Sequence, residues 1–322
     1  MMKLDLIAVR VAARRIEALD IVSLDLVPED GNALPAFAAG AHIDVHLPGG
    51  LVRPYSLCNP PGGESCYRIA VLRDPASRGG SQAVHAHLLV GTALAISPPR
   101  NHFPLDAQAP FHLLLAGGIG ITPLWAMAQA LFQTGQPFEL HFCTRSRART
   151  PFLDTLASSP FAAQVQHHYD DGEPMQKLDI AATIRQAPAG THLYVCGPQG
   201  FIDAVLQAGR DAGWPENRLH REYFGAAPVA SANQGAFELQ LASSGRVIPV
   251  QAHQSALAAL LAAGLDIPMS CEQGVCGTCL TGVRAGTPDH RDQYLTDEER
   301  AANDRFLPCC SRALSPRLVL EL

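Results

Sequence analysis

Four cysteines near the end of the chain have the spacing of an iron–sulfur site. Cys271, Cys276 and Cys279 follow a C-x4-C-x2-C pattern, and Cys309 supplies a fourth thiol further along. Three grouped thiolates with a distant fourth are typical of a plant-type [2Fe–2S] cluster. Structural zinc sites usually hold two paired knuckles instead, so zinc is the less favoured occupant. Cys310 is the alternative to Cys309 as the fourth ligand.

The residues around these cysteines predict the elements that must position them. Gly274 and Gly277 lie where backbone N–H groups must approach sulfur in conformations that a side chain would obstruct. Ser255 is expected to cap a helix, and Thr296 with Glu299 forms a capping-box pattern that opens a second, short helix. Two expected strands and the first helix cover residues 237–242, 247–251 and 256–263.

A second group of residues, far from the cysteines, could hold a phosphorylated aromatic cofactor. Arg53 can pair bidentately with a phosphate, the ring of Tyr55 can lie against an aromatic system, and Ser56 offers a hydroxyl beside them. An ordinary strand with a surface arginine would show the same residues. Dense short strands with Gly and Pro turns surround this motif, which favours a β-barrel or sandwich for the first third of the chain.

A glycine turn follows in the same region and could bind an anion. Gly79, Gly80 and Ser81 precede a helical stretch expected at 82–89, so backbone N–H groups and a helix N-terminus would face a phosphate. Ser81 is the expected N-cap. A flexible loop is the alternative interpretation.

The middle of the chain predicts a nucleotide-binding sheet. Residues 111–116 form a continuous apolar run, as in a buried parallel strand, and a glycine-rich turn at 117–123 leads into a helix expected at 124–132. Strand, glycine turn and helix place a pyrophosphate at a helix N-terminus, although this turn lacks the G-x-G-x-x-G fingerprint. Further strands are expected at 139–143 and 192–195.

Composition and charge exclude several classes of protein. The formal net charge is −6 with no basic block, which gives a nucleic-acid partner no electrostatic footprint. The longest apolar runs are too short to span a bilayer, and the first residues lack a signal-peptide core. Nine cysteines without a secretion signal favour thiolate ligation in a reducing cytoplasm. We therefore expect a cytoplasmic protein with no membrane partner.

The three motifs together resemble a known family. Arg53-Pro54-Tyr55-Ser56 is similar to the R-x-Y-S flavin signature of the ferredoxin-reductase superfamily. The turn at 117–123 with Cys196-Gly197-Pro198 is similar to the pyridine-nucleotide pair of that superfamily. The order of flavin, nucleotide and cluster motifs resembles the phthalate dioxygenase reductase family, which includes the reductases of vanillate and phenoxybenzoate oxygenases.

This resemblance implies a multidomain architecture. We expect an FMN-binding antiparallel β-barrel at 1–107 and an NAD(P)-binding α/β domain with a parallel sheet at 108–226. A linker at 227–235 would then lead to a plant-type [2Fe–2S] ferredoxin domain of the β-grasp type at 236–322. Residues 226–235 have the small, polar, Pro- and Gly-containing composition of a linker.

The resemblance also assigns roles to residues. Ser56 is expected near flavin N5 and Cys196 beside the nicotinamide, as the two catalytic residues. Phe224 would approach the flavin where the nicotinamide stacks. The flavin and the nucleotide together are expected to contact Arg53, Tyr55, Ser56, Ala70, Val71, Leu72, Gly79, Gly80, Ser81, Gly117, Gly118, Gly120, Ile121, Thr122, Pro123, Thr144, Arg145, Ser146, Cys196, Gly197, Pro198 and Phe224.

The expected nucleotide is NADH, with NADPH left open. Some relatives that prefer NADH carry an acid at the position of Ser146, where the adenosine ribose should lie, and this chain does not. Arg145, Arg147 and Arg149 are nearby and could accept a 2′-phosphate.

The resemblance implies a reductase that passes electrons from NAD(P)H through FMN to the cluster, and on to a Rieske-type non-haem iron oxygenase acting on an aromatic or small organic acid. Two alternatives belong to other classes. One is an accessory electron-transfer subunit of another redox complex, and the other is a zinc-stapled nucleotide-binding regulator without redox chemistry.

Overall fold

The computed structural model describes residues 6–62, 65–225 and 235–322, and the chain forms two compact units, Met1–Glu222 and Tyr223–Leu322. The first unit contains a barrel and a parallel sheet, and the second a smaller mixed sheet. The four-part division made from the sequence stays a prediction, and residues 227–234 of its linker lie outside the described residues. None of the helices in the described ranges combines the length and apolar character needed to cross a membrane.

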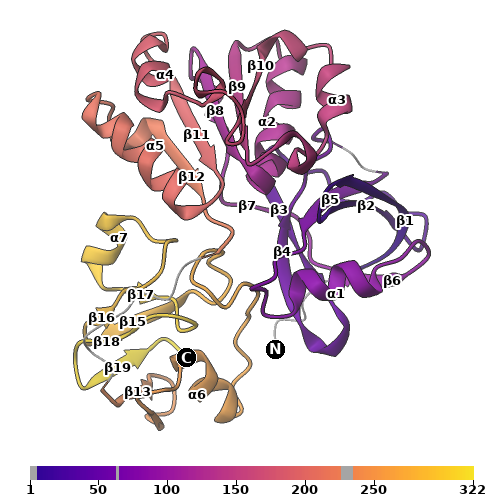
Figure 1. Ribbon diagram of the computed structural model, residues 1–322. Coiled ribbons are helices and arrows are strands. Elements are labelled where there is room, and N and C mark those ends of the chain that lie inside the picture. The colour runs from indigo at the N-terminus through magenta and orange to yellow at the C-terminus, as the bar shows by residue number, and fades with distance from the viewer. Residues whose placement is uncertain (1–5, 63–64, 226–234) are drawn as a thin grey trace. The chain divides into compact units, whose positions relative to one another are not determined.

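Seven strands form the first sheet of Figure 1, in the order β4-β3-β6-β1-β2-β5, with β7 paired to β3. The strands are β1 Ile7–Ala18, β2 Ile21–Pro28, β3 Ala41–His46, β4 Val52–Ser56, β5 Tyr67–Leu72, β6 Ala93–Ile96 and β7 Arg100–Asn101. All pairs are antiparallel, and a bridge between Leu57 and Ile69 joins the end of β4 to β5, which closes the barrel. Alternating residues such as Val9 and Val11 on β1 fill its interior. Helix α1, Gly80–His87, contacts β5.

The second sheet has five parallel strands in the order β10-β9-β8-β11-β12. They are β8 His112–Gly117, β9 Phe138–Thr144, β10 Val165–Tyr169, β11 His192–Cys196 and β12 Leu219–Glu222. Its helices are α2 Ile121–Gln133, α3 Leu153–Ala157, α4 Ile180–Gln186 and α5 Gln199–Asp211. Figure 1 shows α2 and α3 on one face and α4 and α5 on the other, as right-handed crossovers require when the strand order reverses at β8. Every residue of β8 is buried, which explains its continuous apolar sequence.

The second unit is built on the sheet β14-β13-β19-β15-β17, with a small β16–β18 ribbon. Its elements are β13 Phe237–Leu241, β14 Val247–Val250, α6 Ala256–Ala262, β15 Thr281–Ala285, β16 Pro288–Asp289, α7 Asp297–Ala302, β17 Arg305–Phe306, β18 Arg312–Ala313 and β19 Arg317–Leu320. The β13–β14 hairpin is followed by α6, and β19 returns parallel to β13, which is the β-grasp arrangement. The predicted fold class is thereby confirmed: antiparallel barrel, parallel α/β sheet and β-grasp domain.

Single turns of 3-10 helix connect several of these elements. They are η1 Pro48–Gly50, η2 Gly118–Gly120, η3 Arg147–Arg149, η4 Ala162–Gln164, η5 Pro174–Gln176 and η6 Glu216–Arg218. Two of them, η2 and η3, directly follow β8 and β9 and lie at the carboxyl ends of the parallel sheet.

Two of the N-caps predicted from the sequence, Ser255 and Thr296, are correct, and one, Ser81, is wrong. The Ser255 hydroxyl accepts from Ala258 N at 3.1 Å, and Thr296 forms the expected capping box. The prediction that Ser81 caps α1 was wrong. Gly79, at φ 90°, is the N-cap, and the Ser81 hydroxyl accepts instead from the backbone N–H of Asp74 at 3.1 Å.

Candidate functional site

The end of barrel strand β4 meets the carboxyl end of β12 at a pair of side chains, of which Ser56 is buried and Glu222 is half-buried. The Ser56 hydroxyl lies 3.2 Å from Oε2 of Glu222 and donates to it, and Ser56 is only 6% exposed. Cys196 ends β11 directly opposite Glu222 in the parallel register and is fully buried. The fold therefore brings the two residues predicted to be catalytic, Ser56 and Cys196, to either side of one carboxyl group.

Glu222 was missed by sequence reasoning, although the segment 220–225 was recognised as the end of the domain. Desolvation raises the pKa of this carboxyl to about 8, and the Ser56 hydrogen bond lowers it only in part. Burial, followed by the charge of Glu222, raises the pKa of the Cys196 thiol well above its usual value. At neutral pH the site therefore holds a protonated carboxyl and a neutral thiol. No local signal in the sequence could have found it, because β12 reads Leu-His-Arg-Glu and an acid next to Arg221 resembles an ordinary residue of a charged, partly exposed strand.

The two glycine turns predicted for the nucleotide pack directly against each other. A Cβ on Gly120 would lie 2.3 Å from the carbonyl oxygen of Cys196, and one on Gly117 would lie 2.8 Å from Cδ of Pro198. Gly197, at φ 159°, has the Gly117 backbone within 3.1 Å of its own missing Cβ. Glycine is required because two backbone segments, from β8–η2 and from the end of β11, touch without side chains between them.

This contact lies where the strand order reverses, between β8 and β11. Open parallel sheets bind ligands at the carboxyl ends of strands at such a point. Helix α2 begins immediately after the first glycine turn, at Ile121, and the Thr122 hydroxyl donates to the Ile119 carbonyl at 3.1 Å. Ile121, Thr122 and Pro123 are all buried in this first turn. The helix start is thus held rigidly next to the turn that would receive a pyrophosphate.

The predicted phosphate anchors of the barrel also lie together. A Cβ on Gly80 would lie 2.6 Å from Cγ and 3.1 Å from Nε of Arg53, so the arginine side chain lies across the start of α1. Gly79 provides no side-chain cap for this helix. An arginine beside uncapped helical N–H groups has the charge and donors that a phosphate monoester requires. Ala70 and Val71 of β5 are buried, whereas Leu72 and Tyr55 are partly exposed.

The expected ribose residues follow β9. Thr144 is buried, and its hydroxyl lies 2.7 Å from that of Thr150, while Arg145 is exposed and Ser146 is partly exposed. Phe224, which is 40% exposed, is the second residue of the other unit. Gly118 follows β8 in η2, at φ 55° and with open space where a Cβ would stand.

The four cysteine thiols lie in contact within the second unit. Cys271 contacts Cys276 and Cys309, and Cys279 also contacts Cys309. Cys271, Cys276 and Cys279 are at most 6% exposed. Contact with Cys271 and burial raise the pKa of Cys276, because crowded thiols resist forming thiolates without a compensating cation. Two irons would supply that charge, so the donor set fits a [2Fe–2S] cluster.

The loop around these thiols explains its two glycines. Gly274, at φ 73°, would place a Cβ 2.4 Å from Sγ of Cys310, and Gly277, at φ 69°, would place one against the Tyr294 ring. The backbone N–H of Gln273 donates to Sγ of Cys271 at 3.4 Å, as expected of a loop that supports sulfur ligands. The Cys310 thiol packs against Gly274 instead, which favours Cys309 as the fourth ligand.

Comparison with known proteins agrees with this geometry. A family model for a 2Fe-2S iron-sulfur cluster binding domain matches residues 239–314, and one for the N-terminal domain of dimethylamine monooxygenase subunit DmmA-like proteins matches residues 92–219. The chain is 55% identical to vanillate O-demethylase oxidoreductase of Pseudomonas sp. (strain HR199 / DSM 7063), over 98% of this chain and 100% of that protein. It is similar to the solved structure of phthalate dioxygenase reductase, with 38% identity, a TM-score of 0.77, and coverage of 99% and 98% of the two chains. The chain belongs to the phthalate dioxygenase reductase family.

Membership of this family makes the protein an oxidoreductase that serves as the reductase component of an oxygenase system. The chain is also similar to part of an intact type IV self-sufficient cytochrome P450 monooxygenase, with 39% identity and a TM-score of 0.86. That match covers 98% of this chain and 41% of the P450 chain. The same reductase architecture therefore occurs within a longer haem-containing oxygenase.

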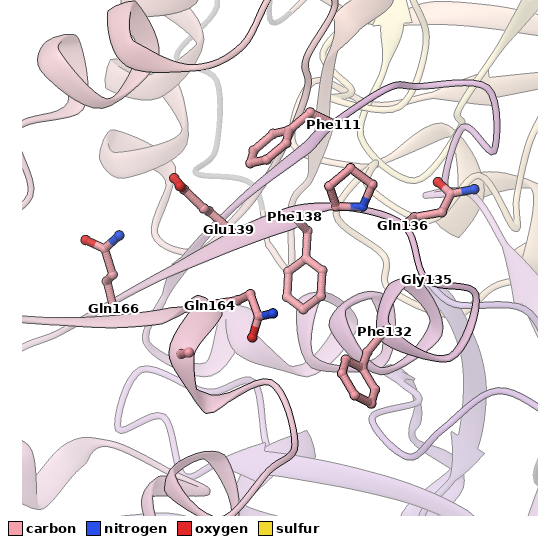
Figure 2. A pocket seen from close by; sticks show the side chains of 10 residues that line it. Phe111, Phe132, Gly135, Gln136, Phe138, Glu139, Gln164 and Gln166 are labelled. Carbon is pink, nitrogen blue, oxygen red and sulfur yellow. The ribbon is translucent and has the colours of Figure 1, made fainter.

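A cavity of about 440 Å³ lies away from these sites, at the amino-terminal ends of β9 and β10. Figure 2 shows the rings of Phe111, Phe132 and Phe138 around it, with the side chains of Glu139 and Gln164 nearby. None of the predicted site residues lines it. The cavity is therefore distinct from the carboxyl-end site that the nucleotide motifs form.

Proposed function

We propose that this reductase takes electrons from NADH, passes them through FMN to a [2Fe–2S] cluster, and delivers them to a Rieske-type oxygenase that acts on an aromatic acid. The observation that carries the proposal is the Ser56–Glu222 hydrogen bond beside Cys196, since it joins the barrel motif to the nucleotide motif at one point. The substrate class is supported by the similarity to vanillate O-demethylase oxidoreductase, which covers nearly the whole length of both chains.

FMN is the flavin that we propose, and Arg53 with the start of α1 at Gly79–Ser81 would hold its phosphate. When bound, a flavin can accept a hydride and release electrons singly, which suits a one-electron cluster. The chain's own contribution is to bind and orient. The glycine turns would hold the pyrophosphate of the nucleotide at the start of α2. The buried Ser56 and Cys196 side chains, together with the half-buried Glu222, would exclude water.

Glu222 and Ser56 would also control a proton. The carboxyl is protonated at neutral pH. When Ser56 gives its hydroxyl proton to a group bound beside it, Glu222 can replace that proton and become a carboxylate, without a bulk water molecule entering the site. The Cys196 thiol is neutral and fully buried, so its proposed role is to shape the nicotinamide site and not to act as a nucleophile.

An anaerobic titration tests the proposal. NADH added to the reconstituted protein should bleach the flavin absorbance and then the cluster absorbance, and a purified Rieske-type vanillate oxygenase should then be reduced. In the Cys276→Ser variant, the flavin should still bleach while no cluster signal appears. A protein that binds no flavin after reconstitution, or whose flavin NADH does not reduce, would contradict the proposal.

A haem oxygenase is the second candidate partner, because the similar P450 carries this reductase architecture in the same chain as its haem domain. A P450 haem domain offered alongside the Rieske oxygenase distinguishes the two. Faster reduction of the haem domain would favour the second candidate, while electron transfer to the Rieske oxygenase alone supports the first.

A further inference from the structure

The corner of the nucleotide domain expected to hold the adenosine ribose is more acidic than its sequence suggested. An acid at the end of the second strand normally holds the ribose 2′-OH of NAD, and here that place, Thr144–Ser146 after β9, has none. The next strand, β10, ends at Tyr169, and Asp170 and Asp171 follow it.

Both aspartates are bonded to the ribose loop through their backbones. The N–H of Asp170 donates to the carbonyl of Thr144 at 3.0 Å, and that of Asp171 donates to the carbonyl of Arg145 at 3.2 Å. Both aspartates are exposed, as is Arg145. The fold thus places two acidic residues beside the segment that lacks one.

One of the three arginines in this corner is already paired with the barrel. Nη1 of Arg149 lies 3.7 Å from Oδ2 of Asp20, which occupies the left-handed turn between β1 and β2 at φ 64°. The preceding Leu19 N–H donates to the carbonyl of Ala148 at 3.0 Å, so the turn holds η3 by its backbone as well. Asp20 also pairs with Arg73 of the barrel.

The remaining charges nearly cancel. Among the described residues, neither Arg145 nor Arg147 forms an ion pair, and the two aspartates are bonded by their backbones to the segment that carries Arg145. A 2′-phosphate would add close to two negative charges to a corner where two aspartates already offset Arg145 and Arg147. A ribose hydroxyl, by contrast, can donate to a carboxylate.

We propose that Asp170 and Asp171 select NADH over NADPH by accepting from the ribose hydroxyls, and that Asp20 acts as a positioning residue by withholding Arg149 from a 2′-phosphate. This inference rests on the proposed function, because it needs a nicotinamide nucleotide at the glycine turns. It names the residues that decide between the two nucleotides, a choice that Arg145, Arg147 and Arg149 had left open.

Steady-state kinetics with an artificial electron acceptor test the inference without an oxygenase. We expect Asp170→Asn with Asp171→Asn to raise the ratio of kcat/KM for NADPH to that for NADH by about tenfold or more, as loss of charged hydrogen bonds implies. Asp20→Asn should lower KM for NADPH without changing kcat for NADPH. Asparagine tolerates the left-handed backbone of that turn, so the variant should fold. Glu173→Gln removes a charge from the same loop and is the matched control, because Glu173 does not bond to the ribose loop.

Each outcome decides a different claim. An unchanged nucleotide ratio in the double variant and in Asp20→Asn would overturn the inference, as would a wild-type protein that uses NADPH as well as NADH. An equal shift in Glu173→Gln would also overturn it, since the effect would then be long-range charge alone. If neither nucleotide reduces the flavin of the wild-type protein, the proposed function itself fails.

Discussion

The stability of a Glu222→Gln variant relative to wild type should increase as pH rises. Replacing a typical surface carboxylate would give the opposite trend. Desolvation raises the pKa of Glu222 from 4.5 to about 8 in the folded chain. Between those values the folded chain keeps a proton that the unfolded chain has lost. Because the native state then binds more protons than the unfolded state, the free energy of unfolding falls as pH rises through this window.

The size of the effect follows from the same values. The difference between 4.5 and 8 corresponds to an upper limit of about 5 kcal/mol at 1.36 kcal/mol per pKa unit. Local relaxation and water penetration reduce this limit, and we expect about 2–3 kcal/mol. In Glu222→Gln no proton is lost. The melting temperature of the variant minus that of wild type should therefore be about 5–10 °C larger at pH 8.5 than at pH 4.5.

Thermal unfolding of the FMN-loaded protein from pH 4.5 to 9, followed by circular dichroism, measures this difference. Stopped-flow reduction of the flavin by NADH over the same range should show a wild-type rate that falls near pH 8, and a slower but pH-independent rate in the variant. Glu216→Gln is the control, because Arg210 lowers the pKa of that exposed carboxyl and its removal should slightly destabilise the protein at neutral pH. A melting difference between wild type and Glu222→Gln that does not change with pH would refute the reasoning.

Three further changes test other parts of the site. Gly120→Ala should destabilise the first unit by about 2–4 kcal/mol in chemical denaturation, because its Cβ would meet backbone atoms at 2.3–2.6 Å. Gly200→Ala is the control: a Cβ there has nothing within 4 Å, so the change should cost no stability or stabilise α5 slightly. Cys309→Ser should abolish the visible absorbance of the cluster while Cys310→Ser retains it, and the reverse result would reassign the fourth ligand. Arg53→Ala should weaken FMN binding at least tenfold, because a charged hydrogen bond to the phosphate is lost. Fluorescence titration measures the affinity, and an unchanged value would argue against the phosphate site.

Local patterns in the sequence predicted features whose cause is itself local. The apolar run at 111–116 became the fully buried strand β8, because a strand covered on both faces needs no polar residues. Ser255 and Thr296 cap their helices as expected, since a cap joins residues two or three apart. Element boundaries were less accurate, and α1 begins at Gly80 where a start at Gln82 was expected. Ser81 was assigned the wrong role because Asp74 lies in another segment of the chain.

The spacing of cysteines, the flavin and nucleotide motifs and their order were enough to predict the family and the fold class, because each motif is a short stretch with its own backbone requirements. Tertiary structure alone decided which distant side chains meet. Ser56 and Glu222 are 166 residues apart, and Asp20 reaches Arg149 from the other sheet of its unit. Neither Glu222 nor Asp20 lies in a recognisable motif, because their roles come from burial and from a neighbouring charge, and both depend on how the barrel and the parallel sheet pack together.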